Sequence, residues 1–262
     1  MATTTETVSG TATVEGAGEA HKAIDPIHQF EIERLIPIRI GDIDLSLTNS
    51  GLWALVAVGL VCLLMLTAPT RAIPTRLQSV AESLYELVFG MTEEVLGPQG
   101  RRYFPFVFTL FAFILAANLL GLIPGAFTVT SHIIVTLALA LVVFIGATVI
   151  GFIKHGPGYL RLFMPAGVPP ALLPFVVPIE IISYFIRPFS LSIRLFANMM
   201  AGHMMLKVIA GFVIMLGVFA GWLPLLALVA IYALELLVAV LQAYVFALLA
   251  CLYLNDALHV DH

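Results

Sequence analysis

A single arginine, Arg194, lies inside a long apolar stretch and is the residue whose chemistry is hardest to explain as packing. Asn198 follows it by four residues and His203 by nine. A cation at the centre of a membrane helix costs roughly 2.5–3.5 kcal/mol on insertion scales. The stretch continues on both sides with few charges, so no helix end is near enough for the side chain to reach the membrane surface. We therefore interpret Arg194 as a functional residue.

Other ionisable residues of the apolar segments are concentrated in the last third of the chain. The apolar stretches 49–68, 103–123 and 129–153 contain no Asp, Glu, Lys or Arg. The polar and charged candidates between residues 174 and 255 are Glu180, Tyr184, Arg187, Ser190, Arg194, Asn198, His203, Lys207, Glu235 and Gln242. Ionisable residues within a membrane typically mark ion or proton pathways.

Helical spacing sorts these candidates into faces. At about 100° per residue, Arg187 and Arg194 share a face, and Glu180 lies about 40° from Arg194. If the helix is continuous, His203 points to the opposite side from Arg194. On the last apolar stretch, Glu235 and Gln242 are seven residues apart and share a face.

Two titratable sets with a fixed cation between them would suit proton transfer. Histidine side chains titrate near neutral pH, and burial can bring a glutamate toward the same range, so His203 and Glu235 could pass protons. Glu180 can serve a second aqueous path. Arg194 keeps its proton at any ordinary pH, so it is a poor relay and a good barrier. It would also attract a carboxylate, which we expect on another subunit because the earlier spans contain none.

Structural alternatives remain open for most of these residues. Glu235 could instead form a buried ion pair with His203 or Lys207, and the Lys207 side chain could extend to the membrane surface. Other side chains could join helices, contact lipid headgroups, or be solvated near a helix start; these are Arg187, Asn198, Gln242 and Glu180.

The composition defines the class of protein. Of the 262 residues, 61% are hydrophobic and 11% are charged, whereas an ordinary soluble domain has about 25% charged residues. The chain is therefore expected to cross a membrane several times. It has no basic stripe for nucleic acid and none of the common catalytic or phosphate-binding motifs, so we expect no nucleic-acid partner, metal, cofactor or catalytic chemistry in the chain itself. Cys62 and Cys251 are expected to be small core hydrophobes.

The pattern predicts an all-α polytopic membrane protein with five transmembrane helices and one amphipathic membrane-surface helix. Apolar residues recur at spacings of three and four over 75–97, with acidic residues between them. The last two helices are long. The first of them, 174–217, would extend about 66 Å as one helix, against a hydrocarbon core of about 30 Å, so it must break into two spans or lie strongly tilted. The expected spans are 49–68, 103–123, 129–153, 174–217 and 222–255.

The flanking segments set the domain organisation and orientation. Residues 1–47 form an N-terminal tail with an extended or interfacial segment at 24–47, residues 48–255 a single membrane domain, and residues 256–262 a C-terminus. The basic residues between spans are Arg71, Arg76, Arg101, Arg102, Lys154 and Arg161. An alternating topology puts them all on one side, which the positive-inside rule makes cytoplasmic. The N-terminus is then periplasmic and the C-terminus cytoplasmic.

Several motifs resemble subunit a of the F-type ATP synthase. The segments LSIRLFANMMAGH at 191–203 and LELLVAVLQAYVFALLACLYLND at 234–256 are similar to its last two helices. DPIHQFEI at 25–32, NLLGLIPG at 118–125 and IEIISYFIRPFSLSIRL at 179–195 also fit, so the likeness covers roughly residues 25–258. The resemblance implies a membrane stator that moves protons, drives rotation of a ring of small hairpin c-type subunits, and couples this rotation to ATP synthesis.

The resemblance also implies residue roles. Arg194 matches the essential arginine that faces the ring carboxylate, with Gln242 and Asn198 near it, and Glu180 matches a glutamate of the half-channel on the ATP-making side. Some bacterial members have an acid at the position of His203 and a histidine at that of Glu235. The exchange seen here is typical of mitochondrial and alphaproteobacterial members and keeps one acid and one imidazole in the path. The family picture explains the long last helices as strongly tilted.

The expected setting is a bacterial inner membrane, with the mitochondrial inner membrane as the alternative. Expected partners are the c-type ring, peripheral-stalk b-type subunits that could bind helix 75–97, the lipid bilayer and protons. A rival hypothesis is an independent proton-coupled transporter, which usually has an internal repeat and an enclosed substrate site; we find no repeat. A second rival is a membrane scaffold or membrane enzyme, for which a buried Arg194 has little use.

Overall fold

The computed structural model describes residues 34–36, 39–40, 43–44, 47–67, 75–123, 125–164 and 172–259. By its internal contacts the chain divides into two compact units. Among the described residues, the larger unit comprises those between 34 and 200 together with 236–259, and the smaller unit comprises 201–235. The two longest helices, α6 (Leu173–Ala220) and α7 (Trp222–Leu258), each contribute a part to both units.

Four short strands precede the helices, within the segment expected to be extended or interfacial. They pair antiparallel in twos, β1 (Arg34–Ile36) with β4 (Leu47–Thr48) and β2 (Arg39–Ile40) with β3 (Ile43–Asp44). The expected tail at 1–23 lies outside the described residues.

The amphipathic helix expected at 75–97 is α3 (Arg76–Leu96). Thr75 caps its start, because its hydroxyl oxygen accepts a hydrogen bond from the backbone N–H of Gln78 at 3.3 Å. Gly97 ends it with a φ of 60°, a backbone conformation that glycine adopts at little steric cost. Both ends of the helix are thus set by local sequence.

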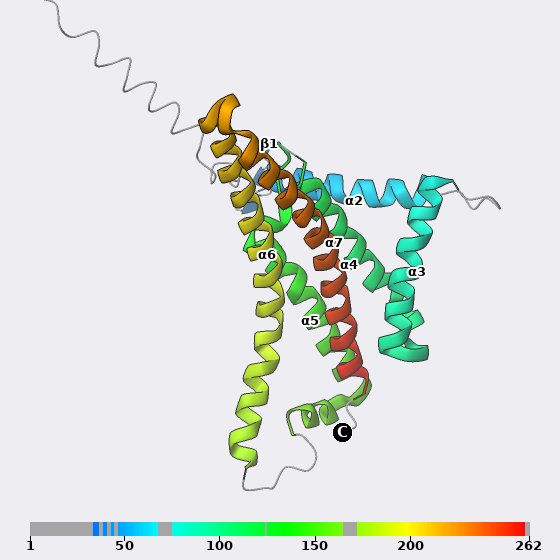
Figure 1. The fold of residues 1–262 in the computed structure, drawn as a ribbon. Helices are drawn as coiled ribbons and strands as arrows, with labels where there is room; N and C mark the ends of the chain where they lie inside the picture. Colours follow the sequence, from blue (N-terminus) through cyan, green and yellow to red (C-terminus); the bar gives the residue numbers. More distant parts are fainter. Residues whose placement is uncertain are drawn as a thin grey trace, which may run out of the picture. The chain divides into compact units, whose positions relative to one another are not determined.

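Helix α4 (Gly100–Gly121) lies at the centre of the larger unit. It follows the short turn η2 (Gly97–Gln99), and both α2 (Asn49–Thr67) and α3 contact it (Figure 1). Val88 and Met91 of α3 belong to the same buried cluster as α4 residues. Helix α3 therefore uses its apolar face to pack against α4, while its acidic side chains stay exposed.

Helices α5 (Ile133–His155) and the C-terminal part of α7 complete this core. η3 (Val129–Ser131) precedes α5 and η4 (Gly156–Phe163) follows it. Helix α7 enters the core with a face of small side chains, which allow helices in a membrane to approach closely. The buried alanines of this face are Ala243, Ala247, Ala250 and Ala257.

Asn118 joins α4 to α7 within the larger unit. Its side chain is fully buried, its amide nitrogen donates to the carbonyl oxygen of Ala239 at 3.2 Å, and its amide oxygen accepts from the Thr130 hydroxyl at 2.9 Å. A polar amide in this apolar surrounding therefore has a partner on each side, as expected of interhelical hydrogen bonding.

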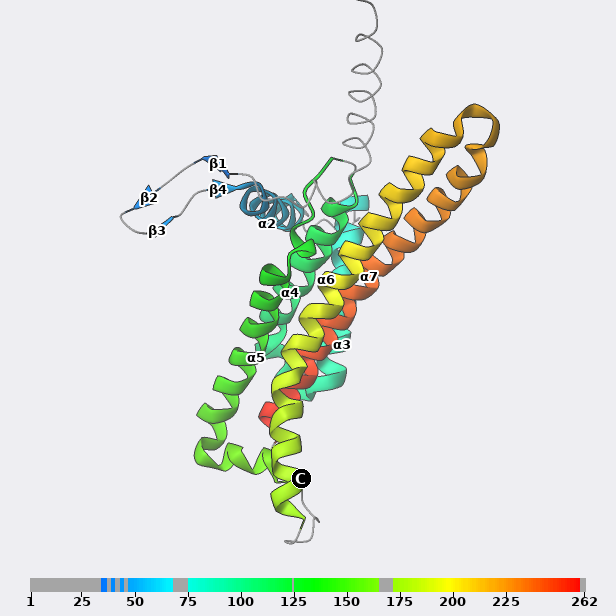
Figure 2. The same cartoon turned by 90° about the vertical axis from the view of Figure 1, so that its left-hand side faces the viewer.

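The smaller unit contains a helical hairpin, formed by the last turns of α6 and the first turns of α7 (Figure 2). Gly217 leaves the helical conformation with a φ of 60°. The backbone N–H of Gly221 then donates to the Gly217 carbonyl oxygen at 2.8 Å. A side chain at Gly221 would place its Cβ 2.8 Å from the Val213 carbonyl oxygen, so the turn requires a glycine there.

Within the described residues, five helical segments are long and apolar enough to cross a membrane. They correspond to the five expected spans, and with α3 they confirm the all-α polytopic fold. Helix α7 continues to Leu258, past the expected end at 255. Pro188 lies inside α6 without interrupting its helical backbone. The expectation that both cysteines are core residues is wrong for Cys62, which is exposed on the sparsely packed α2, whereas Cys251 is buried.

Candidate functional site

Arg194 lies on the outer side of α6 in the larger unit. The inner side of the helix buries Leu191, Leu195 and Met199, which recur every four residues and face the core. This periodicity directs Arg194 outward, and its side chain is exposed. In the described part of the chain it forms no hydrogen bond or ion pair with a carboxylate. A permanent cation on an apolar helix is thus presented to whatever lies outside this chain.

The polar residues expected near Arg194 differ in exposure. Ser190 is exposed, Asn198 is half-buried, and Gln242 is buried on α7. The side-chain nitrogen of Gln242 has no hydrogen-bond partner among the described residues, and no described hydrogen bond joins it to Arg194. The structure therefore leaves Gln242 with an uncommitted donor.

A second cluster joins α6 to the end of α7, also within the larger unit. Arg187 Nη1 donates to Asp256 Oδ2 at 2.8 Å, and Arg187 Nη2 lies 4.0 Å from Glu180 Oε1. Glu180 and Arg187 are seven residues apart, a spacing that predicts side chains near the same face of a helix. The ion pair between them agrees with this prediction. About one third of each side chain is exposed, 33% for Arg187 and Glu180 and 39% for Asp256. The cluster thus combines charge with access to solvent.

Asp256 is the residue that sequence reasoning missed. The set of intramembrane charges was drawn between 174 and 255, because the last span was expected to end there. Helix α7 instead carries Asp256 within its last turns. The signal was present in the LND motif at 254–256, whose acid directly follows an apolar helix.

Tyr184 and Tyr253 flank the Arg187 guanidinium. Its carbon atom lies 5.9 Å from the centroid of each ring, one on α6 and one on α7. Cation–π attraction operates at this distance. Tyr184 is buried, and Tyr253 is a second residue that the sequence did not identify.

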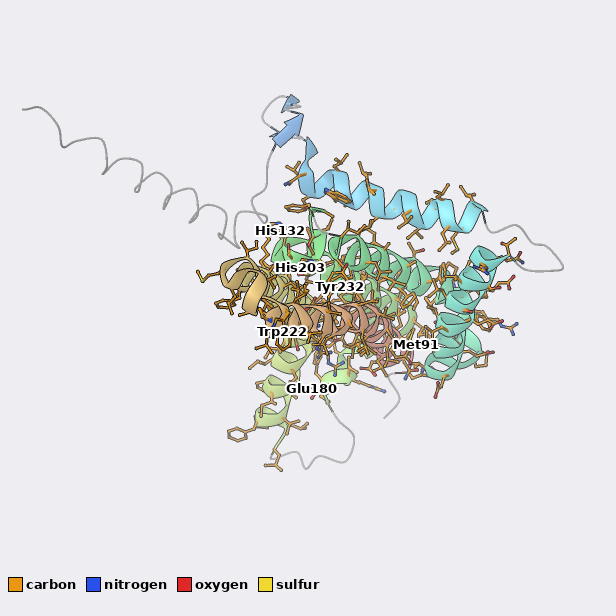
Figure 3. The ribbon with its side chains drawn as sticks, turned by 45° about the horizontal axis from the view of Figure 1, so that its top comes forward. Met91, His132, Glu180, His203, Trp222 and Tyr232 are labelled. Atoms are coloured by element: carbon orange, nitrogen blue, oxygen red, sulfur yellow. The ribbon has the colours of Figure 1, made fainter. Side chains whose placement is uncertain are left out.

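The smaller unit holds His203 and Glu235 together. Both side chains are buried, 8% and 5% exposed, and an electrostatic interaction links them. Figure 3 labels His203 on α6 and Tyr232 on α7 in this hairpin. Glu235 Oε2 has no hydrogen-bond partner among the described residues. Lys207 lies one turn beyond His203. Its side chain is half-buried and also has an interaction partner within the chain.

Gly202 provides the space that the Glu235 carboxyl group occupies. A Cβ atom at position 202 would overlap the Glu235 carboxyl atoms. The absence of a side chain therefore lets the carboxyl group lie directly against the α6 backbone.

Gly202→Ala is expected to displace the Glu235 carboxyl group and to slow the proton conduction that the sequence predicts, measured in membrane vesicles that contain the protein. Gly146→Ala on α5 is the matched control, because no atom lies within 4 Å of a Cβ there. Adding Glu235→Asp, which shortens the acid by one methylene, should partly restore conduction. Equal conduction in Gly202→Ala and the wild type would show that the contact has no role.

Groups of three or more His, Cys, Asp or Glu that could hold a metal ion do not occur among the described residues. The candidate site consists of charged, titratable and uncharged polar side chains.

Comparison with known proteins identifies relatives along almost the whole chain. The family model of the ATP synthase A chain matches residues 51–255. Proteins named ATP synthase subunit a are similar to this chain in Parvibaculum lavamentivorans (55% identical over 249 residues, 91% of this chain and 95% of the relative) and in Chelativorans sp. (57% over 248 residues, 92% and 100%). The protein of that name from Pelagibacter ubique is 53% identical over 244 residues, 92% of this chain and 100% of the relative.

Proposed function

The chain belongs to the ATP synthase A chain family, whose members are the proton-translocating subunit of the enzyme's membrane sector, and we propose that its protons pass through two offset half-channels separated by Arg194. In this proposal the half-channels lead to and from a carboxylate on a ring of small hairpin c-type subunits. Proton flow then turns the ring, and rotation is coupled to ATP synthesis.

The exposure of Arg194 is the observation that carries this proposal. A cation within hydrocarbon requires a countercharge or water. Among the described residues no carboxylate pairs with Arg194, and its helix face is directed outward. A carboxylate on a ring subunit would supply the missing charge. Because the guanidinium does not release its proton, it would attract the deprotonated ring site and prevent protons from crossing directly between the half-channels.

The two titratable clusters would serve as the two half-channels. His203 and Glu235 form the uptake path from the periplasm, because an imidazole and a buried carboxyl group that interact can exchange a proton. Glu180 and Asp256 around Arg187 form the release path on the cytoplasmic side, where their partial exposure gives access to water. During ATP synthesis a proton passes from the first cluster to the ring and leaves through the second.

The membrane location, the orientation and the stalk partner of the chain follow from the same proposal. The chain is an integral membrane protein with relatives in alphaproteobacteria, so we place it in a bacterial inner membrane, with the N-terminus periplasmic and the C-terminus cytoplasmic. Helix α3 exposes acidic side chains at Glu82, Glu86, Glu93 and Glu94. This face is suited to a peripheral-stalk b-type subunit that carries basic side chains.

Sidedness tests the assignment of the clusters. In inverted vesicles the cytoplasmic side faces the medium, so Glu180→Gln should change how ATP-driven proton pumping depends on the pH of the medium. Glu235→Gln should change its dependence on the pH of the lumen. Thr109→Val, which removes an exposed hydroxyl group on α4, is the control and should change neither. If both Glu180→Gln and Glu235→Gln altered the response to the same compartment, the proposed pair of half-channels would be wrong.

A further inference from the structure

Three hydroxyl groups from three different elements form a row beside Arg187. Tyr159 of η4 and Tyr184 of α6 have their hydroxyl oxygens 3.0 Å apart, and Tyr184 and Thr148 of α5 have theirs 2.6 Å apart. Tyr159 is buried against Gly151, where even a Cβ atom would overlap its ring. The row thus links η4 and α5 to α6 within the larger unit.

The hydrogen-bond direction along this row is fixed by its end. Thr148 donates its one hydroxyl proton to the Phe144 carbonyl oxygen at 2.7 Å, because a carbonyl can only accept. Tyr184 must therefore donate to Thr148, and Tyr159 must donate to Tyr184. Each hydroxyl proton is committed, and the row ends at a backbone carbonyl that cannot pass a proton onward.

The same row holds the Tyr184 ring in place under Arg187. The ring packs against Phe144 and Phe163, with centroids 4.8 Å and 5.4 Å away. Its face lies 5.9 Å from the Arg187 guanidinium carbon. The ring is therefore restrained by packing on its faces and edges and by hydrogen bonds at its hydroxyl.

Little space remains between the row and the ion pair. A cavity of about 10 Å³ lies between them, lined by Ala147, Tyr159, Tyr184, Arg187 and Asp256 together with two further aromatic side chains. This volume suits no more than about one water molecule. The guanidinium accordingly has little room for another orientation on this side.

We propose that Tyr184 is a positioning residue, whose ring, restrained by Tyr159 and Thr148, holds the Arg187 guanidinium in contact with Asp256 and near Glu180. Tyr184 does not itself carry protons. An arginine side chain has many rotamers, and ordering it costs conformational entropy. A restrained aromatic face lowers that cost by favouring the orientation that serves both carboxylates. The inference rests on the proposed release path, in which Arg187 sets how readily these carboxylates give up protons.

The test compares two substitutions at the same position. Tyr184→Phe keeps the ring and removes the hydroxyl, whereas Tyr184→Leu removes both. We expect Tyr184→Leu to shift the medium-pH profile of proton pumping in inverted vesicles upward by roughly 0.3–0.7 pH unit, the equivalent of a two- to fivefold change in proton affinity for a lost cation–π contact. Carboxylates that lose their cation hold protons more tightly. Tyr184→Phe should restore most of the wild-type profile.

Two further variants make the test specific. Tyr103→Leu removes a half-buried tyrosine ring from the same core at the start of α4, and it should leave the pH profile unchanged. Arg187→Gln should shift the profile in the same direction as Tyr184→Leu. The double variant should be no worse than Arg187→Gln alone, because Tyr184 acts through Arg187.

The outcomes distinguish the inference from the function on which it rests. If Tyr184→Phe were as defective as Tyr184→Leu, the hydroxyl group and not the ring face would be what Arg187 depends on, and the positioning role proposed for the ring would be overturned. If the effects of Tyr184→Leu and Arg187→Gln multiplied in the double variant, Tyr184 would act independently of Arg187. That result would overturn the positioning role but leave the proposed release path intact. An unchanged medium-pH profile in Arg187→Gln would overturn both the inference and the proposed release path.

Discussion

Replacing Arg194 with alanine is expected to abolish ATP synthesis and ATP-driven proton pumping while the assembled complex is retained. The residue is exposed on α6 and pairs with no carboxylate among the described residues, so its loss should not disturb the fold. Passive proton conduction, measured after the catalytic head is removed, should persist or rise. The barrier between the half-channels would be gone, and protons could cross without turning the ring.

Arg194→Lys separates charge from shape in this experiment. Lysine keeps a positive charge but presents it as a compact, strongly hydrated ammonium group that can lose its proton when buried. We expect it to limit passive conduction more than alanine does and to restore little ATP synthesis. Full coupling in Arg194→Ala, measured by ATP synthesis in energised membranes, would show that the arginine is structural and that the proposed mechanism is wrong.

Glu235→Gln should give the second-largest effect, a loss of about 100-fold in proton conduction, at the lower end of what a positioned proton-transfer group contributes. The carboxyl group is buried against Gly202 and interacts with His203, and glutamine fills the same space without exchanging a proton. The measurement is the initial rate of passive conduction through head-stripped membranes, normalised to the amount of assembled complex.

An exchange variant provides the control for Glu235→Gln. His203→Glu combined with Glu235→His keeps one acid and one imidazole in the hairpin but reverses their helices. If the pair acts as a proton path, the exchange should conduct better than Glu235→Gln. An exchange variant no better than Glu235→Gln, or a Glu235→Gln variant with wild-type conduction, would contradict the uptake path.

The sequence was sufficient for the architecture because a membrane imposes strong rules on composition. Runs of apolar residues long enough to span hydrocarbon are rare by chance, so the five spans could be located from length and hydropathy. The alternation of apolar and acidic residues over 75–97 likewise predicted α3, whereas the roles of Thr75 and Gly97 at its ends came from the structure. Helix boundaries were less certain, and the expected end of the last span at 255 excluded Asp256 from consideration.

The partners of polar residues were harder to predict, because they come from elements far apart in the chain. Spacing within a helix placed Glu180 and Arg187 near one face, but it could not show that Asp256, 69 residues after Arg187, closes the ion pair. The alternative in which Glu235 pairs with His203 or Lys207 was also open. The structure gives Glu235 an electrostatic interaction with His203, and the space that its carboxyl group occupies comes from Gly202, a residue with no polar group for sequence analysis to single out.

The sequence alone determined that the protein crosses a membrane with five helices and that Arg194 is a cation with an unusual energetic cost. These follow from local properties: hydropathy, helical periodicity and the permanent charge of a guanidinium. The tertiary structure decided that Arg194 faces outward, that Asp256 binds Arg187, and that Tyr159, Tyr184 and Thr148 hydrogen-bond in a row beside it. Such contacts depend on the helix rotations that pack the core best, and no single helix contains that information.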